Sequence, residues 1–164
     1  MTKPLPRKIA VMGAGSWGTT FAKVMADAVA ENGIAVQIWA RRDDAAREIN
    51  ERHTNSRYLR DTKLPQNISA SSDRQEVLAG ADLVVLAIPS QSLRAELESF
   101  KNLIEPDAVV LSLMKGLERG TDLRMSQVIA EVAELPAERI AVLSGPNLAM
   151  EIAREQPTAS VVAC

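Results

Sequence analysis

Three glycines in the spacing Gly13-x-Gly15-x-x-Gly18 follow directly on an apolar run that begins at Lys8. In such a pattern the first glycine allows a tight turn, the second lets the backbone approach a phosphate, and the third lets a helix pack closely on the preceding strand. The first turn of that helix would offer unpaired N–H groups and the positive end of its dipole to an anion. The spacing predicts a pyrophosphate site, with a glycine-rich turn that binds nothing as the alternative.

A second candidate for chemistry is the pair Arg41-Arg42, which follows an apolar run over residues 35–39. Sites for NAD place an acid about 20 residues beyond the glycines, where it bonds the ribose 2′-hydroxyl. Two guanidinium groups suit a 2′-phosphate instead, because their fork geometry and permanent charge match it. Asp43 and Asp44 come next and would bind a ribose hydroxyl if the turn differed by one residue. We expect NADP in preference to NAD, unless the arginines are only the solvated start of a helix.

Polar groups after two further apolar runs are candidates for contact with a substrate. Lys115-Gly116 follows residues 109–114, and a lysine there would pair with an anionic substrate or polarise a carbonyl, unless it is simply solvated. Gly145-Pro146 follows residues 140–143 and is typical of a helix start with proline at its first position. Such a start would leave the N–H groups of the next residues free to bind an anion. The alternative is that the motif only caps the helix and binds nothing.

Composition restricts the class of protein. The chain has 164 residues, 46% of them hydrophobic and 24% charged, with a net charge of −2. There is no basic field for nucleic acid, no polybasic arm for a membrane, and no apolar run near the about 20 residues that a spanning helix needs. The single cysteine, Cys164, and the single histidine, His53, leave no internal disulfide and no metal cluster. We expect a cytoplasmic protein without metal, nucleic-acid partner or membrane insertion, with His53 in an exposed loop.

The elements that must position these residues alternate between strands and helices. Strands are expected at residues 8–12, 35–39, 83–88, 109–114 and 140–143, with a short one at 68–70. The runs from 83, 109 and 140 are almost continuously apolar, as in strands buried on both faces of a parallel sheet. This order predicts an α/β fold with a doubly wound, mostly parallel, Rossmann-type sheet, whose ligand lies outside the carboxyl ends of the strands.

Helical spacing of apolar residues marks the segments between the strands. It predicts helices around residues 17–28, 93–100 and 125–132, the last with Thr121-Asp122 as its start and Pro136 just past its end. Residues 50–66 are polar without clear periodicity, so we expect a loop near the ligand. Residues 157–164 are typical of a strand that begins, which suggests a fragment that stops at the edge of a second domain.

Taken together, these motifs resemble bacterial glycerol-3-phosphate dehydrogenase over almost the whole chain. They occur there in the same order: the glycine loop with Ser16-Trp17, then Arg41-Arg42, Asn55-x-x-Tyr58-Leu59, Leu64-Pro65, Pro89-Ser90, Lys115-Gly116, Ser144-Gly145-Pro146 and Pro157-Thr158. The resemblance implies that residues 1–164 are the amino-terminal dinucleotide-binding domain of a longer enzyme. A helical second domain is expected in the parent enzyme and is absent from this chain.

The resemblance also implies roles for single residues. Ser16 and Trp17 would flank the cofactor phosphates. Lys115 would touch the nicotinamide side and the substrate. The remaining implied contacts are Arg41, Arg42 and Tyr58 around the adenosine, Gly145 and Asn147 at the substrate, and Ala149 at the cofactor. The family usually has Ser or Thr where this chain has Asn147, so an amide replaces a hydroxyl at that contact.

The reaction that the resemblance implies is reversible hydride transfer between NAD(P)H and the C2 carbonyl of dihydroxyacetone phosphate. It gives sn-glycerol 3-phosphate for glycerophospholipid synthesis. In the family a lysine of the second domain transfers the proton, so no catalytic residue is expected within this chain. The second domain also allows a homodimer. The alternatives are the cofactor domain of a 2-hydroxyacid or ketopantoate-type dehydrogenase, or a non-catalytic NAD(H)-sensing domain.

Overall fold

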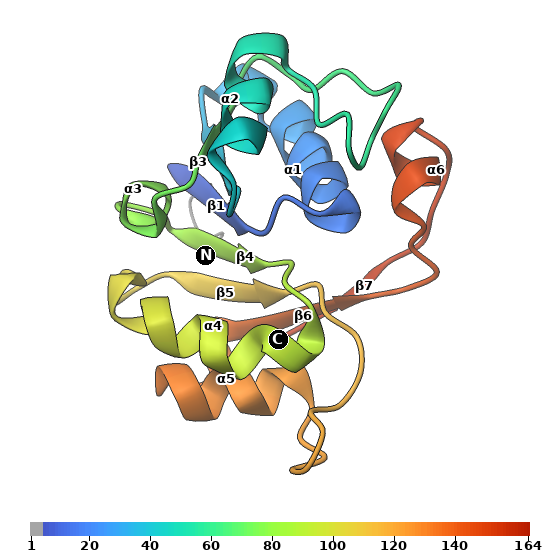
Figure 1. Ribbon diagram of the computed structural model, residues 1–164. Helices are drawn as coiled ribbons and strands as arrows, with labels where there is room; N and C mark the ends of the chain where they lie inside the picture. Colours follow the sequence, from blue (N-terminus) through green and yellow to red (C-terminus); the bar gives the residue numbers. More distant parts are fainter. Residues whose placement is uncertain (1–4) are drawn as a thin grey trace.

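The apolar runs of the sequence form the strands of one sheet in the computed structural model, which describes residues 5–164 (Figure 1). The strand order is β3-β2-β1-β4-β5-β6-β7. The first six strands along the chain are parallel, and β7 is antiparallel to β6. Their bounds are Lys8–Met12 (β1), Ala35–Trp39 (β2), Ile68–Ser71 (β3), Leu83–Leu86 (β4), Val109–Ser112 (β5), Ile140–Ser144 (β6) and Val161–Ala163 (β7).

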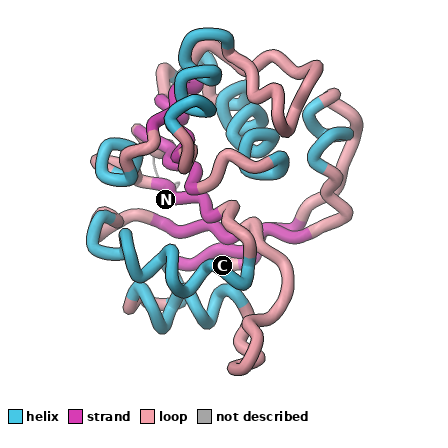
Figure 2. Tube along the Cα trace, in the orientation of Figure 1, coloured by secondary structure: helices cyan, strands magenta, loops and turns pink. Residues whose placement is uncertain are grey.

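Helices cover both faces of the sheet, α1 and α2 on one and α3, α4 and α5 on the other, while α6 packs on α1 (Figures 1 and 2). The α-helices are Ser16–Ala28 (α1), Asp43–Arg52 (α2), Arg74–Leu78 (α3), Leu93–Phe100 (α4), Met125–Ala133 (α5) and Ala149–Ala153 (α6). Short 3-10 turns lie at Ala30–Asn32, Ser90–Ser92, Lys101–Leu103 and Ala137–Arg139.

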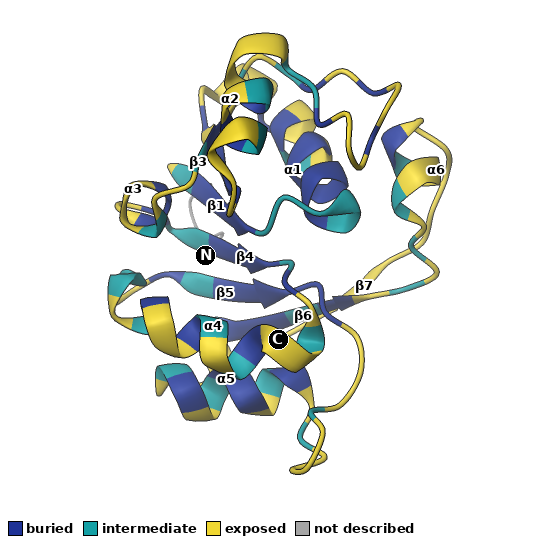
Figure 3. Cartoon of the chain, in the orientation of Figure 1, coloured by how far each residue is buried: buried dark blue, intermediate teal, exposed yellow. Residues whose placement is uncertain are grey.

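Side chains that alternate along the central strand separate the core into two layers. Ile9 and Val11 pack with α1 and α2, whereas Ala10 and Met12 pack with α3, α4 and α5. All four are fully buried, and the central strands are dark blue in Figure 3. Burial on both faces explains why these strands are continuously apolar in the sequence.

The strand order places a topological switch point between β1 and β4. The chain runs outward from β1 through β2 to β3, then returns to β4 and continues to β6 on the other side. The loops that leave β1 and β4 therefore diverge at the carboxyl edge of the sheet. In doubly wound folds this is where ligands bind. The predicted fold class and sheet are confirmed, with β4 and β5 each two residues shorter than expected.

Two predicted helix starts are wrong. Helix α5 begins at Met125, not at Thr121-Asp122, because Arg124 and Gln127 form its capping box. Asp122 instead has a left-handed backbone, with a φ of 55°. Helix α6 begins at Ala149 rather than at Gly145-Pro146, so the expected proline-led anion site does not form there.

The polar stretch 50–66 is not wholly a loop, since α2 continues to Arg52. The stretch then forms a tight turn in which Asn55 pairs with Leu59. His53 lies in the loop just past α2, which it caps with a φ of 50°, but it is only partly exposed, so the expectation of an exposed side chain is wrong. Within residues 5–164, the helices lack the length and apolar composition to cross a membrane.

Candidate functional site

A cleft of about 580 Å³ opens at the carboxyl edge of the sheet, across the switch point. Residues at or after β1, β2, β4 and β5 line it, together with two from the turn after α2. They are Gly13, Ala14, Gly15, Trp17, Gly18, Trp39, Ala40, Arg41, Arg42, Ala45, Arg57, Tyr58, Ala87, Ile88, Pro89, Ser90, Ser92, Glu96, Leu113, Met114 and Lys115.

The three glycines of the loop at the centre of the cleft differ in how much space a Cβ atom would have. A Cβ on Gly18 would lie 2.0 Å from the Gly13 carbonyl oxygen, so only glycine lets α1 pack this closely. A Cβ on Gly13 would lie 2.5 Å from the Ala87 carbonyl oxygen, and the φ of Gly13 is +129°. A Cβ on Gly15, in contrast, would meet nothing within 4 Å. Gly15 has an extended backbone that any residue can adopt, so its missing side chain leaves space in the cleft.

The start of α1 provides the electrostatics of this part of the cleft. Gly15 caps the helix, and its first turn contains no acidic side chain. The first N–H groups of a helix have no partner within it, and they sit at the positive end of the helix dipole. The open space at Gly15 and the free amides together fit an anion such as a phosphate.

Arg41 and Arg42 line the far end of the cleft, after β2. Arg42 pairs with Asp44 at 3.2 Å. Asp43 accepts a hydrogen bond from Ser72, and neither Asp43 nor Asp44 is among the lining residues of this cleft. Asp43 is therefore bonded to Ser72 and the exposed Asp44 to Arg42, while both guanidinium groups border the open space.

The turn after α2 brings Arg57 and Tyr58 to the same end of the cleft. Their side chains are in contact, with the guanidinium carbon 5.8 Å from the ring centre. The turn is fixed to the glycine loop by Asn55, which is 2% exposed. Its Nδ2 donates to the Ala14 carbonyl at 3.0 Å and to the Thr19 hydroxyl at 2.8 Å. One buried amide thus connects two walls of the cleft.

Lys115 lies at the opposite end of the cleft, after β5. Its Nζ donates to the Gly145 carbonyl at 2.7 Å, which brings the ends of β5 and β6 together. An ammonium group has three donors, so this bond leaves two for a ligand. Lys115 is exposed and can meet an anion at this end.

Asn147 and Ala149 lie beyond Gly145, next to β7 and α1. The Oδ1 of Asn147 accepts from the Thr158 and Ser160 hydroxyls at 3.1 and 3.0 Å. Its Nδ2 is buried without a partner within the described residues. The Ala149 carbonyl accepts from Thr20 on α1 at 3.2 Å. A buried donor of this kind is unusual in a folded protein, since buried polar groups are normally paired.

The structure brings most, but not all, of the sequence-predicted residues to one cleft. Gly13, Gly15, Trp17, Gly18, Arg41, Arg42, Tyr58 and Lys115 line it. The others (Ser16, Gly145, Asn147 and Ala149) are not among the residues that line it, and their roles stay predictions. Sequence reasoning assigned no role to Arg57 or Asn55. Nothing in a polar stretch distinguishes a buried asparagine from a solvated one, and Asn55 stood out only as part of the motif with Tyr58 and Leu59.

Comparison with known proteins gives a consistent result. Residues 8–164 match the family described as NAD-dependent glycerol-3-phosphate dehydrogenase N-terminus. The chain is 55% identical over 157 residues to glycerol-3-phosphate dehydrogenase (NAD(P)+) of Corynebacterium jeikeium, covering 96% of this chain and 46% of that protein. It is 53% identical over 164 residues to the protein of the same name from Streptomyces griseus, covering 100% of this chain and 47% of that protein.

A solved structure agrees. Glycerol-3-phosphate dehydrogenase from Saccharomyces cerevisiae has a TM-score of 0.86 to this chain at 32% identity, covering 97% of this chain and 47% of that one. The chain therefore spans about half the length of the relatives it matches.

The buried amide of Asn55 gives a prediction about stability. Asn55→Ala leaves two buried acceptors without their donor and is expected to lower the free energy of unfolding by about 1–3 kcal/mol. Asn55→Asp is expected to lower it further at pH 7, because a carboxylate would face the Ala14 carbonyl. Burial next to an acceptor raises the pKa of the new carboxyl in the folded state. The added loss should therefore grow as pH rises through that pKa and disappear in acid.

Denaturant unfolding at several pH values measures both effects. Asn50→Asp is the matched control, because Asn50 also bonds a backbone group through its amide, at Ala70, but is exposed. Equal pH dependence in the two aspartate variants would contradict the buried-donor role of Asn55.

Proposed function

We propose, from the premise that this chain belongs to the NAD-dependent glycerol-3-phosphate dehydrogenase family, that its cleft binds NAD(P)H for the reversible reduction of dihydroxyacetone phosphate to sn-glycerol 3-phosphate. The observation that carries the proposal is the open space at Gly15, beside the N-terminus of α1 and at the switch point of the sheet. A phosphate can approach the backbone there, where amides and the helix dipole converge.

The positions of the charged groups favour one direction for the cofactor in the cleft. The pyrophosphate would lie on the glycine loop, and the adenosine would extend toward Arg41, Arg42 and Tyr58. The nicotinamide end would then lie toward Lys115, after β5. When bound, the reduced nicotinamide supplies the hydride. This orientation agrees with the roles that the family resemblance gives to Trp17, Tyr58 and Lys115.

Lys115 would stabilise charge and orient the substrate. Reduction of a carbonyl places negative charge on its oxygen, and a fixed cation stabilises that charge more than water does. The bond from Lys115 to the Gly145 carbonyl holds the ammonium group in place. Asn147, two residues beyond Gly145, would donate to an oxygen of the substrate through its Nδ2, which has no partner within the described residues. Gly145 and Asn147 are therefore assigned to substrate binding, and Ser16 and Ala149 to the cofactor.

The chain would be the cofactor half of a longer, two-domain enzyme. The relatives that it matches are about twice as long. Lys115 is the one cationic side chain that lines the cleft after β5, among the residues that the structure describes. Within residues 5–164, the same part of the cleft wall has no histidine or acidic side chain that could donate a proton beside it. A lysine of the helical second domain is assigned the proton transfer, as the family resemblance implies. The same domain would mediate any homodimer.

The arginine pair supports NADP over NAD. Arg41 and Arg42 border the adenosine end, whereas Asp43 and Asp44 bond Ser72 and Arg42 and do not line the cleft. A ribose 2′-phosphate would therefore meet guanidinium groups rather than carboxylates.

The glycine loop gives the first test. Gly15→Val is expected to fold normally, because its side chain enters open space, yet to abolish NADPH binding by filling the phosphate site. Gly18→Ala is the matched variant and should lose stability instead, because its Cβ meets the Gly13 carbonyl. Titration of NADPH fluorescence and thermal unfolding separate the two effects. Unchanged NADPH affinity in folded Gly15→Val would contradict the phosphate site.

Cofactor preference gives the second test. Replacing both Arg41 and Arg42 with alanine is expected to weaken NADPH binding by about 1–3 kcal/mol, the range for lost charge-assisted hydrogen bonds. NADH binding should change much less, because NADH has no 2′-phosphate. Calorimetric titration with both cofactors measures the difference. Equal losses would refute the 2′-phosphate assignment, and Arg47→Ala on the exposed face of α2 serves as the control.

Turnover tests the reaction itself. The full-length enzyme is expected to oxidise NADPH when dihydroxyacetone phosphate is added, and the 164-residue chain to bind NADPH without turnover. Loss of a positioned proton donor alone slows a reaction by about 10²–10⁴-fold. An inactive full-length protein would overturn the proposed function. Turnover by the 164-residue chain at about 10 s⁻¹, an ordinary enzyme rate, would show that the proton donor lies within it.

A further inference from the structure

The loop between β5 and α5 carries Lys115 and turns sharply, partly through left-handed backbone conformations. Three of its residues have positive φ: Gly116 at 112°, Gly120 at 87° and Asp122 at 55°. For a residue other than glycine this conformation is unfavourable, so contacts elsewhere must hold it. Two backbone bonds close the loop on itself, from Glu118 N to Leu123 O and from Asp122 N to Glu118 O, both at 2.9 Å.

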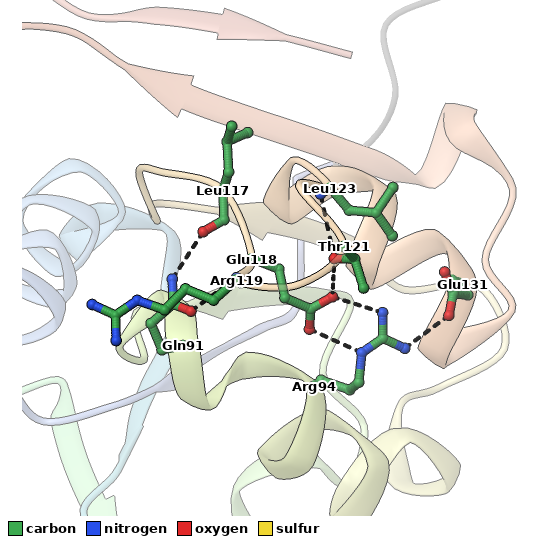
Figure 4. Close-up of polar contacts among 8 residues, drawn as sticks. All are labelled: Gln91, Arg94, Leu117, Glu118, Arg119, Thr121, Leu123 and Glu131. Carbon is green, nitrogen blue, oxygen red and sulfur yellow. Dashed lines mark hydrogen bonds and ion pairs between the residues drawn. The ribbon is translucent and has the colours of Figure 1, made fainter.

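Arg94 on α4 holds the loop from outside (Figure 4). Its Nε and one terminal nitrogen donate to the two carboxylate oxygens of Glu118, each at 2.9 Å. Its other terminal nitrogen donates to Glu131 on α5 at 2.8 Å. Thr121 also donates to Glu118, at 2.6 Å. The guanidinium thus ties the loop to two helices through a planar, two-bond fork.

Gln91, in the turn that follows β4, holds the same loop at a second point. Its Nε2 donates to the Leu117 carbonyl at 2.8 Å, and its Oε1 accepts from the Arg119 N–H at 3.1 Å (Figure 4). Both polar ends of one amide therefore bond the backbone on the two sides of Glu118. The neighbouring Ser90 lines the cleft, so this contact joins two walls of the site.

We propose that Gln91, Arg94 and Glu118 form a loop clamp whose function is to position Lys115 for the substrate. The inference rests on the proposed function, in which Lys115 contacts the substrate, and it assigns none of the three residues to the chemistry. They are positioning residues, because they act on the substrate only through the loop that they hold.

The geometry indicates that the clamp is stronger than an ordinary surface ion pair. The Glu118 side chain is only 14% exposed, and the Arg94 side chain 38%. Arg94 also holds the pKa of the Glu118 carboxyl below its usual range, chiefly through their hydrogen bonds, so the carboxyl stays ionised near neutral pH. Only two residues separate Glu118 from Lys115, so a small displacement of the loop moves the ammonium group.

Glu118→Gln tests the clamp in the full-length enzyme. A glutamine side chain keeps one acceptor and turns an NH₂ group toward the guanidinium, so the fork cannot form. The expected result is a kcat/KM for dihydroxyacetone phosphate that falls about 10- to 100-fold, since small misplacements have effects of this size. The NADPH Kd should stay within about twofold, because the glycine loop and the arginine pair are unaffected. A lysine at position 94 offers a single point of contact, so the kcat/KM of Arg94→Lys should lie between that of the original protein and that of Arg94→Ala.

Asp82→Asn is the matched control. Asp82 accepts a similar fork from Arg7, with Nε at 3.4 Å and a terminal nitrogen at 3.0 Å, but at the amino end of β4. The Asp82→Asn substitution should lower thermal stability without changing the substrate KM or kcat. If Asp82→Asn and Glu118→Gln change kcat/KM equally, the clamp is only structural and the proposal is overturned.

Hydrogen exchange provides a readout that does not depend on activity. In Glu118→Gln and Gln91→Ala, the amides of Glu118, Arg119 and Asp122 should exchange at least about tenfold faster than in the original protein, while those of β5 stay protected. Unchanged exchange in both variants would overturn the clamp. If the unmodified full-length enzyme does not reduce dihydroxyacetone phosphate, the proposed function fails, and faster exchange would still support the clamp.

Discussion

The packing of backbone against backbone at the start of α1 is the contact on which the rest of the site depends. Gly18 lies on the Gly13 carbonyl and Gly13 lies on the Ala87 carbonyl, with no room for a Cβ at either place. The contact brings a helix N-terminus to the switch point between β1 and β4. The arginines after β2 and the lysine after β5 then stand on opposite sides of one anion site, because parallel strands end at the same edge.

Charge in the cleft is local and differs from the charge of the whole chain. The protein has a net charge of −2, yet Arg41, Arg42 and Lys115 are among the groups that line the cleft. The one acid in its wall, among the residues that the structure describes, is Glu96, which pairs with Arg74. With Glu96 paired to Arg74, the cleft favours an anionic ligand, although the overall composition would not suggest one.

The sheet was the easiest part to predict, because strands buried on both faces are almost continuously apolar, as β4 and β5 are. Helix starts were harder. Thr121-Asp122 has the composition of a cap, but the Thr121 hydroxyl bonds Glu118 and the chain turns once more before α5. Asn55 gained no role because its partners lie 41 and 36 residues away in the chain. Local patterns carry no information about such contacts.

A crystal structure of the chain with NADPH would show whether the switch-point cleft is a dinucleotide site oriented by the glycine loop. We expect pyrophosphate oxygens at the amides that begin α1, beside Gly15, and the 2′-phosphate between Arg41 and Arg42. The nicotinamide should lie toward Lys115. A cofactor bound in the reverse direction, or with its ribose on Asp43 or Asp44, would contradict a site oriented by the glycine loop and the arginine pair.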